Sequence, residues 1–265
     1  MWLAQSVLTG NEAGYWFISE GGRIWLLEGD IPFGSAADFK LAGLTGQVIG
    51  QWQEKHVWLV NHSMPKAMHS VKKLLGRDEC LFQLAGRATQ LSLFYQSHQF
   101  CGRCASAMQV SKSEWCCICS HCRQRYYPQI SPAVIVAIRD KNKLLLANHA
   151  RHTANNVYTV LAGFVEVGET VETALEREIF EESKLKVKHI RYVSSQPWPF
   201  PNSLMLAYLA DYQEGVLNID KKELVDANWY HYTRLPKLPA YGTIARRLIE
   251  DTIALCRRYD EEGDE

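Results

Sequence analysis

The chain has 265 residues, 47% of them hydrophobic and 22% charged, which is normal for a globular protein and excludes a fibrous or largely disordered chain. Its 29 basic and 29 acidic residues balance, so a general polyanion binder is excluded and any contact with nucleic acid would need a local patch. Residues 1–10 lack the pattern of a signal peptide, and no apolar run is long enough to span a membrane. We therefore expect a soluble, cytoplasmic protein of two or three domains that does not bind membranes.

The first region, residues 1–96, is rich in aromatic side chains and in short runs typical of strands. Three such runs, at residues 15–19, 23–28 and 56–60, are separated by turns that contain glycine. Apolar residues then recur at helical spacing within residues 80–100. The pattern predicts a β-rich N-terminal domain with a trailing helix.

The second region, residues 97–125, contains six of the eight cysteines. Two CxxC pairs, "CGRC" and "CSHC", can each supply two thiolates to one tetrahedral ion, which predicts one structural zinc ion per chain. Cys116 leaves a second pairing open, because with Cys119 it also forms a CxxC pair. We prefer the set that runs directly into the next domain: Cys101, Cys104, Cys119 and Cys122. His121 is then a bystander, because four thiolates already fill the site.

The third region, residues 126–256, alternates strand and helix patterns. The expected elements are strands at residues 133–138, 143–147, 189–196 and 204–212, and helices at residues 172–183 and 243–258. This mixture predicts an α/β or α+β domain. Residues 257–265 are acidic and are expected to be a frayed tail.

Three glutamates in "EREIFEESKL" share one helical face, because Glu178, Glu181 and Glu182 stand at i, i+3 and i+4. Like charges at this spacing destabilise a helix by about 0.2–0.5 kcal/mol per pair. Divalent cations bound there would relieve the repulsion, neutralise the phosphates of a diphosphate ester and lower the pKa of a bound water. Mg²⁺ or Mn²⁺ suits such oxygen ligands. The alternative is a solvated helix face.

Residues 163–185, "GFVEVGETVETALEREIFEESKL", resemble the Nudix box, in which glycine, glutamate, an Arg-Glu pair and a Glu-Glu pair stand at fixed spacing. The matching residues are Gly163, Glu169, Arg177, Glu178, Ile179, Glu181, Glu182 and Leu185. Lys184 departs from the pattern, since the family has glycine there. We expect this lysine to alter the helix end and to leave the chemistry intact. The resemblance implies a Nudix α/β/α sandwich with a mixed sheet, behind a zinc ribbon and a β-rich domain.

The same resemblance implies roles for individual residues. Glu182 is the candidate that activates water, and Glu169 pairs with Arg177 to orient the loop. The implied ligands of Mg²⁺ or Mn²⁺ are Glu178, Glu181, Glu182, Glu223 and the carbonyl of Ala162.

The stretch "SQPWPFPNS" at residues 195–203 contains three prolines, which predict a stiff extended loop that cannot pair as a central strand. Its aromatic residues suit either a binding wall or a buried connector, and the residues alone leave both open. Together with the zinc module and "QLAGRATQL", the stretch resembles the NADH pyrophosphatases. That family implies a homodimer that hydrolyses NAD(H) and related dinucleotides to NMN(H) and AMP, with 5′-NAD caps on RNA as further substrates.

The resemblance also implies substrate-contact positions, one of which, Lys72, stands for a family arginine. They are Lys72, Glu114, Tyr127, Phe164, Gln196, Pro197, Trp198, Pro199, Phe200, Pro201, Asn202, Ser203 and Ala245.

Two further functions stay open. One is a zinc-ribbon and Nudix module that binds nucleotide or RNA without cleaving it, although the intact glutamate set argues against this. The other is an enzyme whose main substrate is NAD-capped RNA, held by a local patch that includes Arg103, Lys112 and Arg123.

Overall fold

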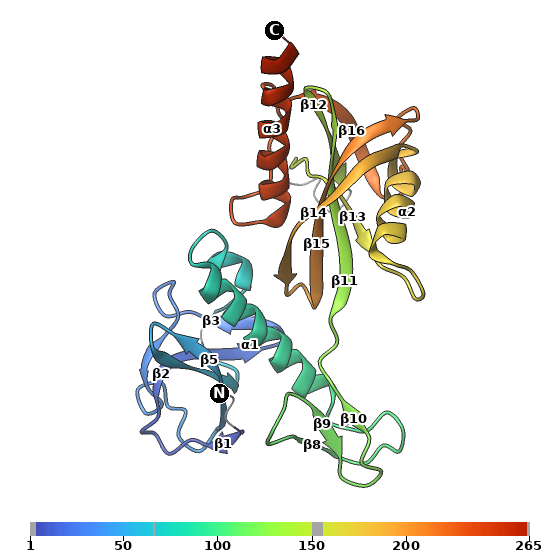
Figure 1. Ribbon diagram of the computed structural model, residues 1–265. Coiled ribbons are helices and arrows are strands. Elements are labelled where there is room, and N and C mark those ends of the chain that lie inside the picture. Colours follow the sequence, from blue (N-terminus) through green and yellow to red (C-terminus); the bar gives the residue numbers. More distant parts are fainter. Residues whose placement is uncertain (1–3, 66, 150–155, 264–265) are drawn as a thin grey trace. The chain divides into compact units, whose positions relative to one another are not determined.

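The computed structural model describes residues 4–65, 67–149 and 156–263 (Figure 1). The chain forms two compact units. One contains the residues up to Gln129 together with Pro199–Asn202, and the other contains Ile130–Trp198 and the residues from Ser203 onward. No helix in the described ranges is long and apolar enough to cross a membrane.

The first unit is built on a seven-stranded mixed sheet. Its strands are β1 (Ser6–Val7), β2 (Ala13–Glu20), β3 (Arg23–Trp25), β4 (Phe33–Ser35), β5 (Thr45–Trp52), β6 (Lys55–Asn61) and β7 (Met68–His69). The order is β1-β5-β6-β2-β3-β7, with β4 paired to β2, and β2 and β6 are parallel. Trp16, Ile18 and Trp58 form part of its core. The predicted β-rich N-terminal domain is confirmed.

A short 3-10 helix, η1 (Val71–Leu74), precedes α1 (Glu79–Ser97), which packs on this sheet. Asp78 caps α1, because its Oδ1 accepts a hydrogen bond from the N–H of Leu81 at 2.7 Å. At the other end, the Tyr95 hydroxyl donates to Gln47 Oε1 at 2.9 Å, deep in the sheet. These contacts fix both ends of the trailing helix.

A small antiparallel sheet follows, in the order β10-β9-β8. The strands are β8 (Met108–Val110), β9 (Cys117–Cys119) and β10 (Arg125–Tyr126). Cys101 and Cys104 precede β8, while Cys119 ends β9 and Cys122 follows it before β10, so the sheet helps to hold the two pairs together.

The second unit is a mixed sheet between two helices. Its elements are β11 (Ser131–Asp140), β12 (Lys143–His149), β13 (Leu161–Phe164), α2 (Val171–Ser183), β14 (Lys186–Trp198), β15 (Ser203–Glu214), β16 (Leu224–His231) and α3 (Ile244–Gly263). The order is β14-β15-β11-β12-β16, with β13 paired to β11, and only the β11–β15 pair of this sheet is parallel in the described residues.

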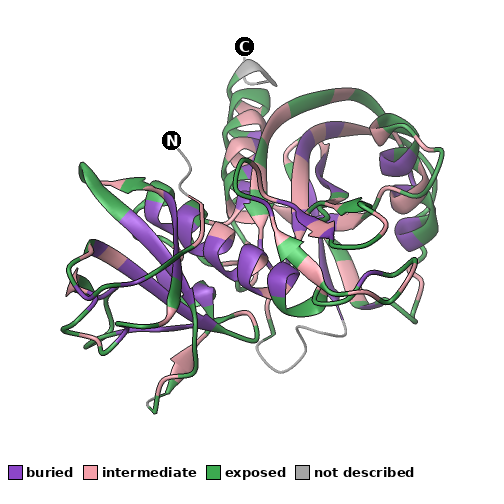
Figure 2. Ribbon diagram, turned by 90° about the horizontal axis from the view of Figure 1, so that it is seen from below, coloured by how far each residue is buried: buried purple, intermediate pink, exposed green. Residues whose placement is uncertain are grey.

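Helices α2 and α3 cover opposite faces of this sheet (Figure 1), and each face has its own buried cluster. Buried positions gather in the strands and on one side of each helix (Figure 2). The predicted α/β/α sandwich with a mixed sheet is therefore confirmed.

Two segments differ from the sequence-based expectation. The prediction of a loop at residues 195–203 is wrong in its first half, because Pro197 and Trp198 belong to β14. This strand lies at the edge of the sheet, where the backbone N–H that proline lacks is not needed for pairing. Helix α3 runs on to Gly263, past the expected start of a frayed tail. Asp260 explains the extension, since its Oδ1 accepts a hydrogen bond from Asn142 Nδ2 at 3.0 Å.

Candidate active site and zinc centre

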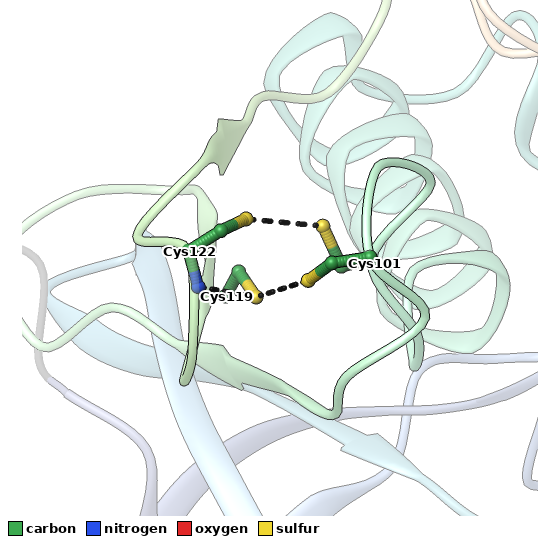
Figure 3. Close-up of side chains that lie close together, drawn as sticks. Cys101, Cys119 and Cys122 are labelled. Atoms are coloured by element: carbon green, nitrogen blue, oxygen red, sulfur yellow. Dashed lines mark hydrogen bonds between the residues drawn. The ribbon is translucent and has the colours of Figure 1, made fainter.

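The four cysteine sulfurs of the CxxC pairs point toward one another (Figure 3). Cys101 Sγ lies 3.6 Å from Cys122 Sγ, and Cys104 Sγ lies 3.5 Å from Cys119 Sγ. All four sulfurs lie within 4.8 Å of one another. Zinc–sulfur bonds of about 2.3 Å in a tetrahedron place sulfurs roughly 3.8 Å apart. The side chains therefore fit one zinc ion, and the chain carries a four-cysteine zinc site.

Backbone N–H groups stabilise the thiolate form of Cys101 and Cys104. The N–H of Arg103 donates to Cys101 Sγ at 3.4 Å. The N–H of Ser106 lowers the pKa of Cys104 to about 6. Zinc binds the thiolate, so the local backbone favours the ligating form.

Cys116 and Cys117 lie outside this cluster. Both are buried, and burial raises their pKa, that of Cys117 to about 11. A buried thiol with a raised pKa stays protonated and behaves as a small apolar side chain. The second cysteine pairing is thus not the one that the fold assembles.

Helix α2 presents the motif glutamates to the neighbouring strand β13. Thr170 caps the helix, with its Oγ1 accepting from the N–H of Thr173 at 3.2 Å. Ile179 anchors the apolar face of α2 in the core beneath the sheet. That anchoring buries Glu182, which is 2% exposed, and leaves Glu181 exposed.

Gly163 on β13 makes room for Glu178. A Cβ placed on Gly163 would lie 1.8 Å from Glu178 Cδ, so no other residue fits there while Glu178 keeps its position. Ala162 precedes it on β13 and pairs with Ile135 of β11. Helix and strand therefore meet with a carboxylate between them, a cradle that suits a cation.

Arg177 ties the site together through five acceptor oxygens on four residues. Its Nε and Nη2 donate to the two carboxylate oxygens of Glu169 at 2.7 and 2.9 Å. Its Nη1 donates to Glu178 Oε1 at 2.9 Å and to Glu181 Oε2 at 3.0 Å. Its Nη2 also donates to the Phe164 carbonyl at 2.9 Å. One guanidinium thus links α2 to the end of β13 and to the loop after it.

The charges in this network shift the carboxylate pKa values in opposite directions. Hydrogen bonds from Arg177 lower the pKa of Glu169 to about 2. Burial raises the pKa of Glu178, and the carboxylates of Glu181 and Glu223 add to that rise against the opposing effect of Arg177. Glu223, far along the chain, is therefore close enough to act electrostatically on the motif helix.

The donor set fits a hard divalent cation, because it offers carboxylate and carbonyl oxygens only. The candidate ligands are Glu178, Glu181, Glu182, Glu223 and the carbonyl of Ala162. Across residues 4–65, 67–149 and 156–263, only the four cysteines lie close enough together to form a complete ligand group. At the glutamate site, Glu178 and Glu181 are instead hydrogen-bonded to Arg177.

Lys184 takes the left-handed conformation at the end of α2, with φ 61° and ψ 17°. Its N–H donates to the Phe180 carbonyl at 2.9 Å, and its Nζ lies 5.1 Å from the centre of the Phe180 ring. The expectation of an altered helix end is therefore wrong. The lysine keeps the backbone geometry that usually favours glycine, and its ammonium points to a partly exposed ring.

In the second unit, Gln196 uses both ends of its side chain to hold α3. Its Nε2 donates to the Gly242 carbonyl at 2.8 Å, and its Oε1 accepts from the N–H of Ile244 at 2.9 Å. Ala245 follows in the first turn of α3 and is half-buried. Phe164, by contrast, is 57% exposed at the end of β13. Substrate contact at these positions stays a prediction.

In the first unit, Glu114 accepts hydrogen bonds from Arg125 and from the Tyr127 hydroxyl, the latter at 3.3 Å. Lys72 Nζ lies 4.8 Å from the centre of the Phe200 ring. Tyr127 is 50% exposed. The structure thus brings these predicted residues together in two groups, Glu114 with Tyr127 and Lys72 with Phe200.

The proline-rich stretch makes the turn between two strands. Pro197 and Trp198 end β14, and Ser203, paired with Trp198, begins β15. The turn itself consists of Pro199, Phe200, Pro201 and Asn202. Asn202 Nδ2 donates to the Gln129 carbonyl at 3.1 Å, which anchors the turn in the first unit.

The fold and the two sites define a Nudix hydrolase that follows a zinc ribbon. Residues 129–252 match the NUDIX domain family, and residues 96–127 match the NADH pyrophosphatase zinc ribbon domain. The proteins named NAD-capped RNA hydrolase NudC from Erwinia tasmaniensis and Edwardsiella ictaluri are each 58% identical over 96% of this chain, covering 97% and 98% of their own lengths. The protein of the same name from Yersinia pestis strain Pestoides F is 55% identical over 96% of this chain, and the match covers 97% of its own length. The chain belongs to the NudC family of Nudix hydrolases.

Sequence reasoning missed one residue that touches the site. The Oδ1 of Asp220 accepts a hydrogen bond from the N–H of Lys222 at 2.9 Å. Aspartate often forms this kind of turn by bonding to the backbone two residues further on. The backbone N–H of Asp220 donates to the Glu182 carbonyl at 3.1 Å. Nothing local in the sequence indicates that second contact, because the two residues lie 38 positions apart.

Proposed function

We propose that this chain hydrolyses the pyrophosphate bond of NAD(H), giving NMN(H) and AMP, and removes 5′-NAD caps to leave 5′-monophosphate RNA. The observation that carries the proposal is the buried Glu182 beside the cradle of Glu178 and Gly163, in a chain so similar to named NAD-capped RNA hydrolases. The site offers carboxylates where an anionic diphosphate must approach, which suits cation-assisted chemistry.

When bound, Mg²⁺ or Mn²⁺ neutralises the diphosphate and makes water more acidic. The residues that would hold it are the four glutamates and the Ala162 carbonyl named above. Glu182 accepts the proton of the attacking water, whose oxygen bonds to phosphorus. The bond from that phosphorus to the bridging oxygen breaks, and the bridging oxygen leaves with the other phosphate. Arg177 and Glu169 hold the loop and α2 in place during this step.

We further propose a homodimer that works in the cytoplasm. A reducing compartment suits the zinc site, since its four thiolates would otherwise be open to oxidation. Light scattering on a size-exclusion column tests the dimer, and a mass of 30.3 kDa would contradict it.

Glu182→Gln tests the chemistry. Losing a general base commonly costs about 10²–10⁴-fold in rate, and the same side chain is a proposed metal ligand. We expect a loss of at least that size in NADH turnover, followed by chromatography of NMN and AMP, with an unchanged melting temperature. Glu176→Gln is the matched control, an exposed glutamate on the same helix and outside the motif.

Near-normal turnover in Glu182→Gln would overturn this mechanism. NADH binding without hydrolysis by the wild type would favour the non-cleaving module instead. Rates for NADH, NAD⁺, ADP-ribose and NAD-capped RNA, compared at one salt concentration, then rank the substrates.

A further inference from the structure

The segment between β15 and β16 runs along the C-terminal end of α2. Gly215 starts it with φ +113°, and a Cβ there would lie 2.7 Å from the Lys184 carbonyl oxygen. Further on, the N–H of Asn218 donates to the Ser183 carbonyl at 3.0 Å. Helix ends leave carbonyls without intrahelical partners, and this segment satisfies two of them, those of Glu182 and Ser183. The end of the catalytic helix is therefore held by a distant part of the chain.

Asp220 bonds to the backbone of both Glu182 and Glu223. Its N–H donates to the Glu182 carbonyl at 3.1 Å, and its own carbonyl accepts from the N–H groups of Glu223 at 3.1 Å and Leu224 at 2.9 Å. Leu224 is 1% exposed and opens β16, so the far side of the turn is fixed in the core. Asp220 therefore connects the backbone of Glu182 to that of Glu223 through two hydrogen bonds.

The Asp220 side chain keeps this turn in shape. Its Oδ1 accepts from the N–H of Lys222 at 2.9 Å, which closes a tight turn just before Glu223. Without that bond the turn keeps its backbone hydrogen bonds and loses a side-chain restraint, so the Glu223 carboxylate is held less firmly near Glu178, whose pKa it influences.

We propose that Asp220 is a positioning residue of the divalent-metal site, which sets Glu223 against Glu182. This rests on the proposed function, since that function makes both glutamates metal ligands. Residues that orient metal ligands commonly contribute about 10–100-fold to metal affinity. Asp220 acts through its turn and not through its charge.

Two substitutions separate the turn from the charge. Asp220→Asn keeps an oxygen that accepts from Lys222 and loses the charge. Asp220→Glu keeps the charge and places it too far out to close the turn. Mn²⁺ titration of the zinc-loaded full-length protein, followed by electron paramagnetic resonance of free Mn²⁺, should show affinity within about threefold of wild type for Asp220→Asn and about 10–100-fold weaker for Asp220→Glu. Lys221→Ala, a neighbouring exposed residue, is the control and should bind as wild type.

The reverse order of the two variants would make Asp220 a ligand or a simple charge and would overturn the proposal. Equal affinity in all variants would overturn it too. A wild type that neither binds Mn²⁺ nor hydrolyses NADH would instead remove the proposed function.

A double-mutant cycle tests whether the effect passes through Glu223. In a Glu223→Gln background, Asp220→Glu should weaken Mn²⁺ binding by less than about threefold more, because the ligand it positions is already gone. Full additivity of the two losses would show that Asp220 acts elsewhere.

Discussion

The Glu178 carboxylate occupies the space that a side chain at position 163 would need, and glycine leaves that space open. A Cβ at Gly163 would lie 1.8 Å from the Glu178 carboxyl carbon, well inside any allowed contact. The burial that results raises the pKa of Glu178. Glycine is thus needed at position 163 because of the limited space next to the carboxylate, and not because of a positive φ, which Gly163 does not adopt.

Gly163→Ala should therefore displace Glu178. We expect Mn²⁺ affinity and NADH turnover to collapse, and the free energy of unfolding to fall by about 1–3 kcal/mol because of overpacking. Urea unfolding and a Mn²⁺ titration measure these effects. Adding Glu178→Ala to Gly163→Ala should restore most of the stability and none of the activity. A double variant as unstable as Gly163→Ala would place the clash elsewhere.

Lys184 adopts a conformation that costs a residue with a side chain roughly 1–2 kcal/mol. Lys184→Gly should raise the free energy of unfolding by about 0.5–1 kcal/mol in urea, because part of the released strain is offset by losing the contact with Phe180. Lys184→Ala is the matched control: it loses that contact and keeps the strain, so it should be less stable than wild type. A stabilised alanine variant would contradict this account.

At the scale of elements, β14 and α3 are joined by one side chain. Gln196 stands on β14 and caps α3 by accepting from the N–H of Ile244. The resemblance implies a substrate contact for the same residue, yet both ends of its amide are engaged within the second unit. Its structural contribution can therefore be measured apart from any role in binding.

Gln196→Ala should lower the free energy of unfolding by about 0.5–2 kcal/mol, the usual cost of losing a helix cap. Gln196→Glu keeps the acceptor for Ile244 and loses the donor to Gly242, so it should lose less. Thermal unfolding of the zinc-loaded proteins, without added Mg²⁺ or Mn²⁺, gives both values. If both variants unfold like wild type, the cap contributes nothing to stability.

At the scale of the whole molecule, the first of the two units includes a module that is too small to have a hydrophobic core of its own. Residues 96–127 match a zinc ribbon, and chains below about 40 residues usually need a metal or disulfides to fold. Its four sulfurs already converge. The ion is therefore expected to hold this part of the chain together without entering the chemistry at α2.

Cys119→Ser should reduce the zinc content well below one ion per chain and make residues near the ribbon sensitive to protease. Elemental analysis and limited proteolysis measure both. Cys80→Ser, an exposed cysteine outside the cluster, should retain zinc and resist protease like the wild type. Full zinc retention in Cys119→Ser would mean that another residue, such as Cys116, can replace it.

Features that depend on local spacing could be predicted from the amino-acid sequence. Two CxxC pairs indicated the zinc site, the glutamates at i, i+3 and i+4 indicated a cation site, and alternating patterns indicated a sheet with helices. Each of these depends on residues that are close together in the chain, whose geometry follows from a helix turn or a knuckle.

The contacts that join these features could be seen only in the folded chain. The bond from Asp220 to Glu182, the approach of Glu223 to Glu178 and the cap of Gln196 on Ile244 link residues 38 to 48 positions apart. Such contacts depend on how strands order themselves in a sheet and where the connecting segments then run. No local pattern in the sequence records that order, so the residues that hold the site in shape became visible only in the fold.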